Sequence, residues 1–131
     1  MSAGFEVVVR GGTEAAWVAR RAIAESDPTL PAALRNDLSL LVTELVTNAV
    51  RHGGATASRP IKIEIRRQAD RIRVDVVTPG SDFDPPAQAA NGDSSGGWGL
   101  FLVDQIAERW GTRPAAAGTC VWFELPAGVA A

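Results

Sequence analysis

The stretch that decides the fold is Leu41–Gly53, with the sequence LVTELVTNAVRHG. Through this stretch and the residues before it, apolar side chains recur three and four residues apart, which is the period of one buried helix face. Glu44 and Asn48 are four residues apart, so they project from one side of this helix, one turn from each other. A carboxylate and an amide at the edge of a buried face suit a divalent cation with a water or hydroxyl beside it, because hard cations take oxygen ligands. The apolar positions of the helix are Leu34, Leu38, Leu41, Leu45 and Ala49.

Composition limits the class of protein. The 131 residues are the usual size of one domain, and we expect a single domain over residues 1–131. Hydrophobic residues make up 46% and charged residues 21%, the balance of a globular chain rather than a disordered one. A formal net charge of −2 gives no general attraction to nucleic acid or to an acidic membrane. No apolar run approaches a membrane span and no signal-peptide pattern begins the chain, so we expect a cytoplasmic protein without a membrane or nucleic-acid partner.

Two side-chain groups have ordinary explanations. The single Cys120 excludes an internal disulfide, and we expect it to be an inert strand residue. A cluster of arginines on two neighbouring strands fits a solvated strand face better than a nucleic-acid patch, given the overall charge. These arginines are Arg66, Arg67, Arg71 and Arg73.

The first half of the chain predicts one strand and two helices. Consecutive valines predict a strand at Phe5–Arg10, which two glycines end. Thr13 can cap the helix that follows, and this helix ends at Ser26–Pro28. A long helix begins after Thr29, with a proline tolerated in its first turn, and runs to about His52.

The second half predicts strands around one more helix. Alternating apolar and charged residues predict a hairpin of two strands, Ile61–Arg66 and Arg71–Val76. The segment from Thr78 to Gly97 is rich in Gly, Pro, Ser and Asp and predicts a long loop of the kind that often binds ligands. A helix is expected at Trp98–Trp110, ended by a glycine, and a last strand at Gly118–Leu125.

This order of elements does not fit a parallel, doubly wound sheet, because its central strands are joined by a hairpin. We therefore expect an α+β fold. Its two layers would be a largely antiparallel mixed sheet and three helices on one face of that sheet.

A second informative stretch is Gly96–Val103, with the sequence GGWGLFLV. Glycines before a helix let backbone N–H groups approach a ligand, and the positive end of a helix favours phosphate. The same pattern also fits a flexible hinge, so it is a weak signal alone. Its position after a long loop, in a chain that already carries Glu44 and Asn48, makes phosphate binding the more informative interpretation.

Together these segments resemble the anti-sigma-factor serine-protein kinases. That family belongs to the ATPase superfamily shared by gyrase, a class of heat-shock chaperones, histidine kinases and mismatch-repair ATPases. The resemblance covers Phe5–Leu125. The stretch Glu44–His52 (ELVTNAVRH) is similar to the N box of the family almost letter for letter, and Ala107–Gly111 (AERWG) is typical of its actinobacterial members. The resemblance implies the ATP-binding fold known as the Bergerat type.

The resemblance also implies roles for individual residues. Asn48 would ligate Mg²⁺ between the phosphates of ATP, and Glu44 would be the catalytic carboxylate that orients or deprotonates the attacking hydroxyl. Thr119 would line the adenine end of the site. In such enzymes the acceptor is a serine of an anti-anti-sigma protein, a second surface holds a sigma factor inactive, and the chains often form homodimers. Backbone contacts to the phosphates would come from Gly97, Gly99 and Leu100.

The chain departs from the family in the motif Asp-x-Gly-x-Gly-Phe, whose aspartate accepts a hydrogen bond from the adenine amine. Alignment on Phe83 keeps Gly80 but places Thr78 at the aspartate and Asp82 at the second glycine. A neutral hydroxyl makes a hydrogen bond about half as strong as a charged acceptor does. An imperfectly paired buried amine costs about 1–3 kcal/mol, so we expect nucleotide binding weakened about 10- to 100-fold.

Three functions remain open on the sequence. The intact pair of Glu44 and Asn48 favours a serine/threonine-protein kinase that uses ATP and Mg²⁺. Thr78 and Asp82 favour a degenerate module that regulates transcription only by binding proteins. A fragment of a sensor kinase is the weakest alternative, because His52 is the only histidine and lies within the N box.

Overall fold

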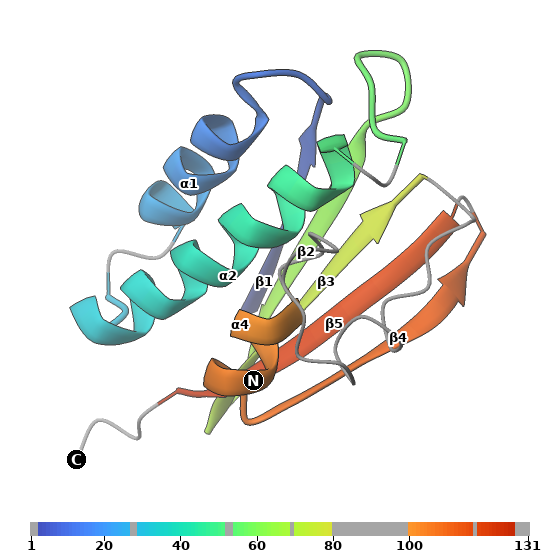
Figure 1. Cartoon of the computed structure of the whole chain (residues 1–131). Helices are drawn as coiled ribbons and strands as arrows, with labels where there is room; N and C mark the ends of the chain where they lie inside the picture. Colours follow the sequence, from blue (N-terminus) through green and yellow to red (C-terminus); the bar gives the residue numbers. More distant parts are fainter. Residues whose placement is uncertain are drawn as a thin grey trace.

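The computed structural model describes residues 3–26, 29–51, 54–68, 70–79, 100–116 and 118–127. Figure 1 shows helices packed against a twisted sheet. None of the described helices has the length and hydropathy needed to cross a bilayer. The elements in chain order are β1 (Ala3–Val9), α1 (Ala15–Ser26), α2 (Ala32–Arg51), β2 (Ile61–Arg67), β3 (Arg71–Thr78), α4 (Leu100–Ile106), β4 (Arg109–Ala115) and β5 (Gly118–Pro126).

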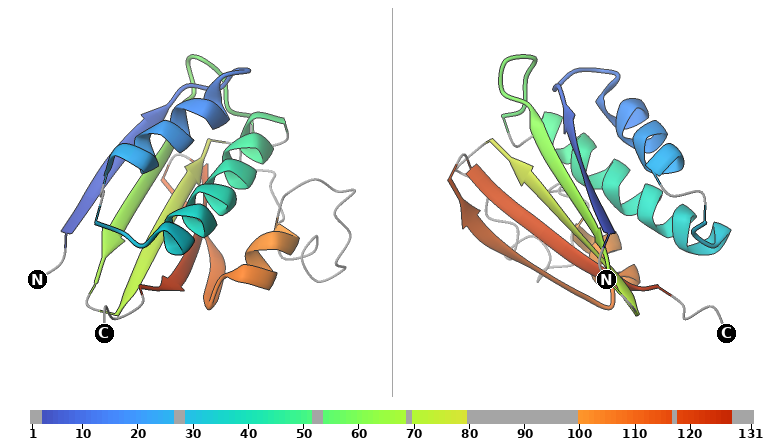
Figure 2. Two further views of the ribbon diagram at one scale, coloured as in Figure 1. Left: turned by 90° about the vertical axis from the view of Figure 1, so that its left-hand side faces the viewer. Right: turned by 180° about the vertical axis from the view of Figure 1, so that it is seen from behind.

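The sheet has five strands in the order β1-β2-β3-β5-β4. Each neighbouring pair of described strands is antiparallel, so the sheet is more regular than the mixed sheet expected. The three described helices all lie on one face of it, as the two views of Figure 2 show. The predicted two-layer α+β architecture is confirmed.

The core lies between the helices and the inner face of the sheet. The alternating isoleucines and valines of β2 and β3 place one side chain in two against the helices, as their period of two requires. On α2, the five apolar positions predicted from the sequence are all buried. The outer face of the sheet carries charged side chains, so each strand separates an apolar layer from an ionic one.

One rim of the sheet, which we call the Thr78 rim, is formed by the end of β1, the start of β2, the end of β3 and the start of β5. The C-terminal end of α2 reaches the same rim, because the chain leaving it passes through Ala55 and Thr56, and Gly11 after β1 donates to the Thr56 carbonyl at 3.0 Å. The two ends of the described chain lie at the opposite rim, where Ala3 pairs with Arg67 and Pro126 pairs with Arg71.

The prediction of one helix over Trp98–Trp110 is wrong in its second half. The described helix is only α4, and Arg109 and Trp110 instead begin β4, an edge strand absent from the sequence-based prediction. Its sequence, RWGTRPA, has no alternation of apolar and polar residues, so pairing with β5 rather than local propensity determines its structure. Pro114 is acceptable there because an edge strand has one unpaired side. Gly111 therefore lies within a strand and does not end a helix.

Candidate functional site

The described residues include four buried polar side chains, and their surroundings differ. Asp75 and Glu124 lie on the outer face of the sheet and are paired with arginines. Asn48 and Thr78 lie on the inner side, at the Thr78 rim, where the rest of the interior is apolar. A polar end to an otherwise apolar interior is where a ligand site is expected.

Asn48 is the more unusual of the two inner residues. It is 5% exposed, and its Nδ2 is buried without a hydrogen-bond partner among the described residues. An unsatisfied buried donor costs about 1–3 kcal/mol. The amide is therefore available to a group that the protein itself does not supply.

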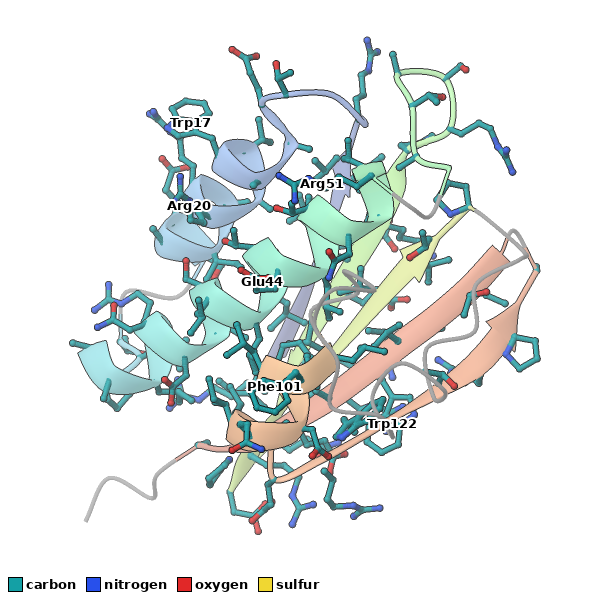
Figure 3. The ribbon with its side chains drawn as sticks, viewed as in Figure 1. Trp17, Arg20, Glu44, Arg51, Phe101 and Trp122 are labelled. Atoms are coloured by element: carbon teal, nitrogen blue, oxygen red, sulfur yellow. The ribbon has the colours of Figure 1, made fainter. Side chains whose placement is uncertain are left out.

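Glu44 lies one turn before Asn48 on α2 and is partly exposed. Leu34 and Asp37 of α2 line one cavity together with Ile106 of α4, so the edge of α2 that carries Asp37 faces α4. Glu44 and Asn48 follow Asp37 by about two and three helical turns and so belong to the same edge. In Figure 3, the labelled Glu44 on α2 and Phe101 on α4 lie on the same side of the sheet.

Thr78 ends β3 and is 3% exposed. Its partner across the ladder is Thr119 of β5, so the two threonine side chains share the inner face as a cross-strand pair. The backbone beside this pair makes two close contacts. Nη2 of Arg59 donates to the Pro79 carbonyl at 2.9 Å, and a Cβ on Gly118 would collide with the Thr78 carbonyl.

Leu100 begins α4 and is fully buried. A helix of seven residues is too short to be stable by itself, so its position depends on tertiary contacts. Leu100 and Val103 anchor it in the core, and Trp110 Nε1 donates to Asp104 Oδ1 at 2.9 Å. Together these contacts fix the position of α4.

Three of the four arginines predicted as a cluster, Arg66, Arg71 and Arg73, form ion pairs on the outer face of the sheet, whereas Arg67 donates to Thr29 Oγ1 at 3.1 Å. Three arginines surround Glu124, with N–O distances of 3.0 Å from Arg71, 3.5 Å from Arg73 and 3.7 Å from Arg109. The hydrogen bond to Glu124, followed by the one to Asp70, raises the pKa of Arg71 above its ordinary value. Carboxylates already occupy these guanidinium groups, so the face is a neutralised network rather than an open anion site.

The structure brings some of the predicted residues together. Glu44 and Asn48 lie one turn apart on α2, and Thr78 pairs with Thr119 at the rim where α2 ends. Leu100 is at the start of the helix beside α2. The remaining predicted contacts lie outside the described residues, namely Gly80, Phe83, Gly97 and Gly99.

Two interactions near the site were not predicted. The sequence pattern assigns no role to Arg59, yet its guanidinium donates to the Pro79 carbonyl and fixes the chain after Thr78. Asp104 and Trp110 were placed in one helix, yet their hydrogen bond joins α4 to β4. Both are tertiary contacts between separate elements, and no local sequence pattern signals them.

The described residues suit a cation that is coordinated mainly by bound phosphate groups and only in small part by the protein. They contain no group of three or more His, Cys, Asp and Glu side chains placed to hold a metal. Mg²⁺ commonly binds through one or two protein oxygens together with substrate phosphates. The Asn48 amide offers one such oxygen, and its unpartnered nitrogen offers a donor, so the donor set fits a metal–phosphate group.

Comparison with known proteins agrees with this fold. The family model of the histidine kinase-like ATPase domain matches residues 13–125. A crystal structure of the RsbU and RsbW domains of Rv1364c from Mycobacterium tuberculosis is similar, with a TM-score of 0.67 and 19% sequence identity over 94% of this chain. The match covers 32% of that chain, so it concerns about a third of its length. None of the curated proteins compared with the chain matches it significantly.

Proposed function

The chain belongs to the histidine kinase-like ATPase domain family, and from this premise we propose that it binds ATP with Mg²⁺ and acts as a serine/threonine-protein kinase. The observation that carries the proposal is the unpartnered amide of Asn48, buried one turn from the partly exposed Glu44. Phosphoryl transfer depends mostly on positioning and charge neutralisation, which an amide ligand and a nearby carboxylate can provide.

Each site residue within the described part of the chain has a proposed role. Asn48 holds the phosphate–metal group, and Mg²⁺ neutralises charge on the phosphates when it is bound. Glu44 accepts the proton of the attacking hydroxyl while that oxygen bonds to the terminal phosphorus and ADP leaves. Thr78 and Thr119 contact the base, and Leu100 begins the helix beside the phosphates. By resemblance, Gly80, Phe83, Gly97 and Gly99 complete the nucleotide site.

The proposed phosphate acceptor is a serine of an anti-anti-sigma protein, and the proposed second partner is a sigma factor. Both come from the resemblance in sequence, with support from a structural neighbour that contains an RsbW domain. A homodimer is proposed on the resemblance alone.

The first experiment measures nucleotide binding and tests the role of the Asn48 amide. Titration calorimetry with ATP and Mg²⁺ is expected to show binding to the wild-type chain, and Asn48→Leu is expected to abolish it. The same variant should unfold at the same or a higher temperature, because it removes an unsatisfied buried donor whose cost is about 1–3 kcal/mol. Loss of binding with retained stability separates a ligand role from a structural one.

Thr43→Val is the matched control. Thr43 Oγ1 is the other buried side-chain atom without a partner among the described residues, and it lies five residues before Asn48, on another side of α2. This variant should bind nucleotide as the wild type does. If Asn48→Leu also bound ATP with wild-type affinity, the assigned site would be wrong.

Glu44→Gln tests catalysis separately from binding. With labelled ATP and an anti-anti-sigma protein as acceptor, the variant should bind nucleotide normally and transfer phosphate about 10²- to 10⁴-fold more slowly, because the amide cannot accept the proton. Equal transfer rates in variant and wild type would remove Glu44 from the mechanism.

A second candidate function is a non-catalytic module that regulates transcription only by binding proteins. Thr78 favours it, because a neutral hydroxyl stands where the family has a carboxylate. No heat at millimolar nucleotide, together with tight binding of the partner protein, would select this alternative.

A further inference from the structure

The threonine pair at the Thr78 rim has a well-determined position. Thr78 follows Val74 and Val76 on the inner face of β3, and Thr119 precedes Val121 on the inner face of β5. Side chains paired in this way across antiparallel strands have Cβ atoms about 4.5–5.5 Å apart. Two hydroxyl groups therefore lie side by side at the polar end of the interior.

Neither β3 nor β5 carries a carboxylate on its inner face. Asp75, the nearest acid on β3, points to the outer face, where it pairs with Arg73 at 3.1 Å and Arg113 at 3.2 Å. A threonine hydroxyl rotates about its C–O bond, so the proton of Thr78 can turn toward a ligand at this end of the interior.

A hydroxyl and a carboxylate select bases differently. An ionised carboxylate only accepts hydrogen bonds, whereas a threonine hydroxyl both donates and accepts and rotates to suit its partner. Adenine presents an amino donor at position 6, and guanine presents a carbonyl acceptor at the same position. A carboxylate would accept a hydrogen bond from the adenine amine and repel the guanine carbonyl, but a hydroxyl can form a hydrogen bond with either group.

We infer that the Thr78–Thr119 pair makes the nucleotide site a general purine site, which binds GTP and ATP with affinities within about tenfold of each other. This inference rests on the proposed function, because it assigns the threonine pair to the base of the nucleotide. The hydroxyl of Thr78 donates to the guanine carbonyl or accepts from the adenine amine, and Thr119 lies beside it.

Competition for a fluorescent ATP analogue, with MgATP and MgGTP as competitors, measures the ratio directly. Dissociation constants within a factor of ten support the inference, and a larger preference for ATP overturns it while leaving the proposed function intact. If neither nucleotide competes and calorimetry shows no binding, the proposed function itself fails.

Variants at Thr78 test its role. Thr78→Asp provides only an acceptor, so the preference for ATP over GTP should rise at least tenfold, the effect of one well-placed hydrogen bond. Thr78→Val keeps the shape without the hydroxyl, so both nucleotides should weaken by the same factor. An unchanged ratio in folded Thr78→Asp, checked by circular dichroism, would overturn the inference; if that variant does not fold, the wild-type ratio decides.

Discussion

Single residues on the two faces of the sheet are buried for different reasons. Asp75 and Glu124 lose their hydration but gain arginine partners, so their burial is compensated within the protein. Asn48 has no such compensation among the described residues. Departures from full hydrogen bonding concentrate at functional sites, and this residue is where binding activity is expected to outweigh stability.

Cys120 allows a prediction at the same scale. It is buried, and burial, followed by the charge of Asp75, raises the pKa of its thiol. Reaction with a thiol reagent at neutral pH should therefore be slow in the folded chain and fast in denaturant, because the thiolate is the nucleophile. A rapid reaction of the native chain, followed by absorbance, would show that this strand opens locally.

The same shift has a consequence for stability. The thiol ionises at a lower pH in the unfolded chain than in the folded one. Its contribution to the free energy of unfolding is therefore fully present below the ordinary thiol pKa, and this contribution is lost as the pH rises through the higher pKa of the folded state. A Cys120→Ala variant should lack this alkaline loss.

At the scale of elements, one glycine of β4 leaves room for a tryptophan ring of β5. The indole of Trp122 lies under the guanidinium of Arg73, 4.3 Å from its ring centroid, and a Cβ on Gly111 would come within 2.9–3.0 Å of the same indole. Figure 3 labels Trp122 at the strand pair that this packing joins.

Gly111→Ala should therefore destabilise the protein by about 1–3 kcal/mol, the usual cost of overpacking. Urea denaturation measures the change. In a Trp122→Ala background the same substitution should cost much less, because the clashing ring is gone, and an equal cost in both backgrounds would contradict the assigned contact.

Elements differed in how well the sequence predicted them. The long helix α2 followed from its apolar period, and β2 and β3 from strict alternation, because each buries one face. β4 has neither signal, since its place at the edge depends on β5 and on the room that Gly111 leaves for Trp122.

The site was predictable to the extent that it is local. The spacing of Glu44 and Asn48 follows from the helix, and the structure confirms it. The pairing of Thr78 with Thr119 needed the strand order, which no single segment encodes. The roles of all the predicted site residues remain predictions, and Gly80, Phe83, Gly97 and Gly99 also lie outside the described residues.

At the scale of the whole molecule, the sheet separates an apolar layer from an ionic layer. Glu124 is the centre of the ionic layer, with a side chain that is 8% exposed and three arginines around it. Glu64, also on the outer face, has a side chain that is 29% exposed and pairs with Lys62 and Arg66.

Glu124→Gln should lower the free energy of unfolding by about 2–4 kcal/mol, because it leaves crowded arginines without their common anion. Glu64→Gln, the matched control, should cost less than about 1 kcal/mol, as exposed pairs do. Chemical denaturation of both variants checks the difference, and equal losses would show that the ionic layer acts as scattered surface pairs.

Both ends of the described chain emerge at the rim opposite Thr78. A tag or a neighbouring domain fused at either end would therefore start away from the proposed nucleotide site. Gene fusion and linker exchange would change what this domain is tethered to without altering the residues proposed to bind nucleotide.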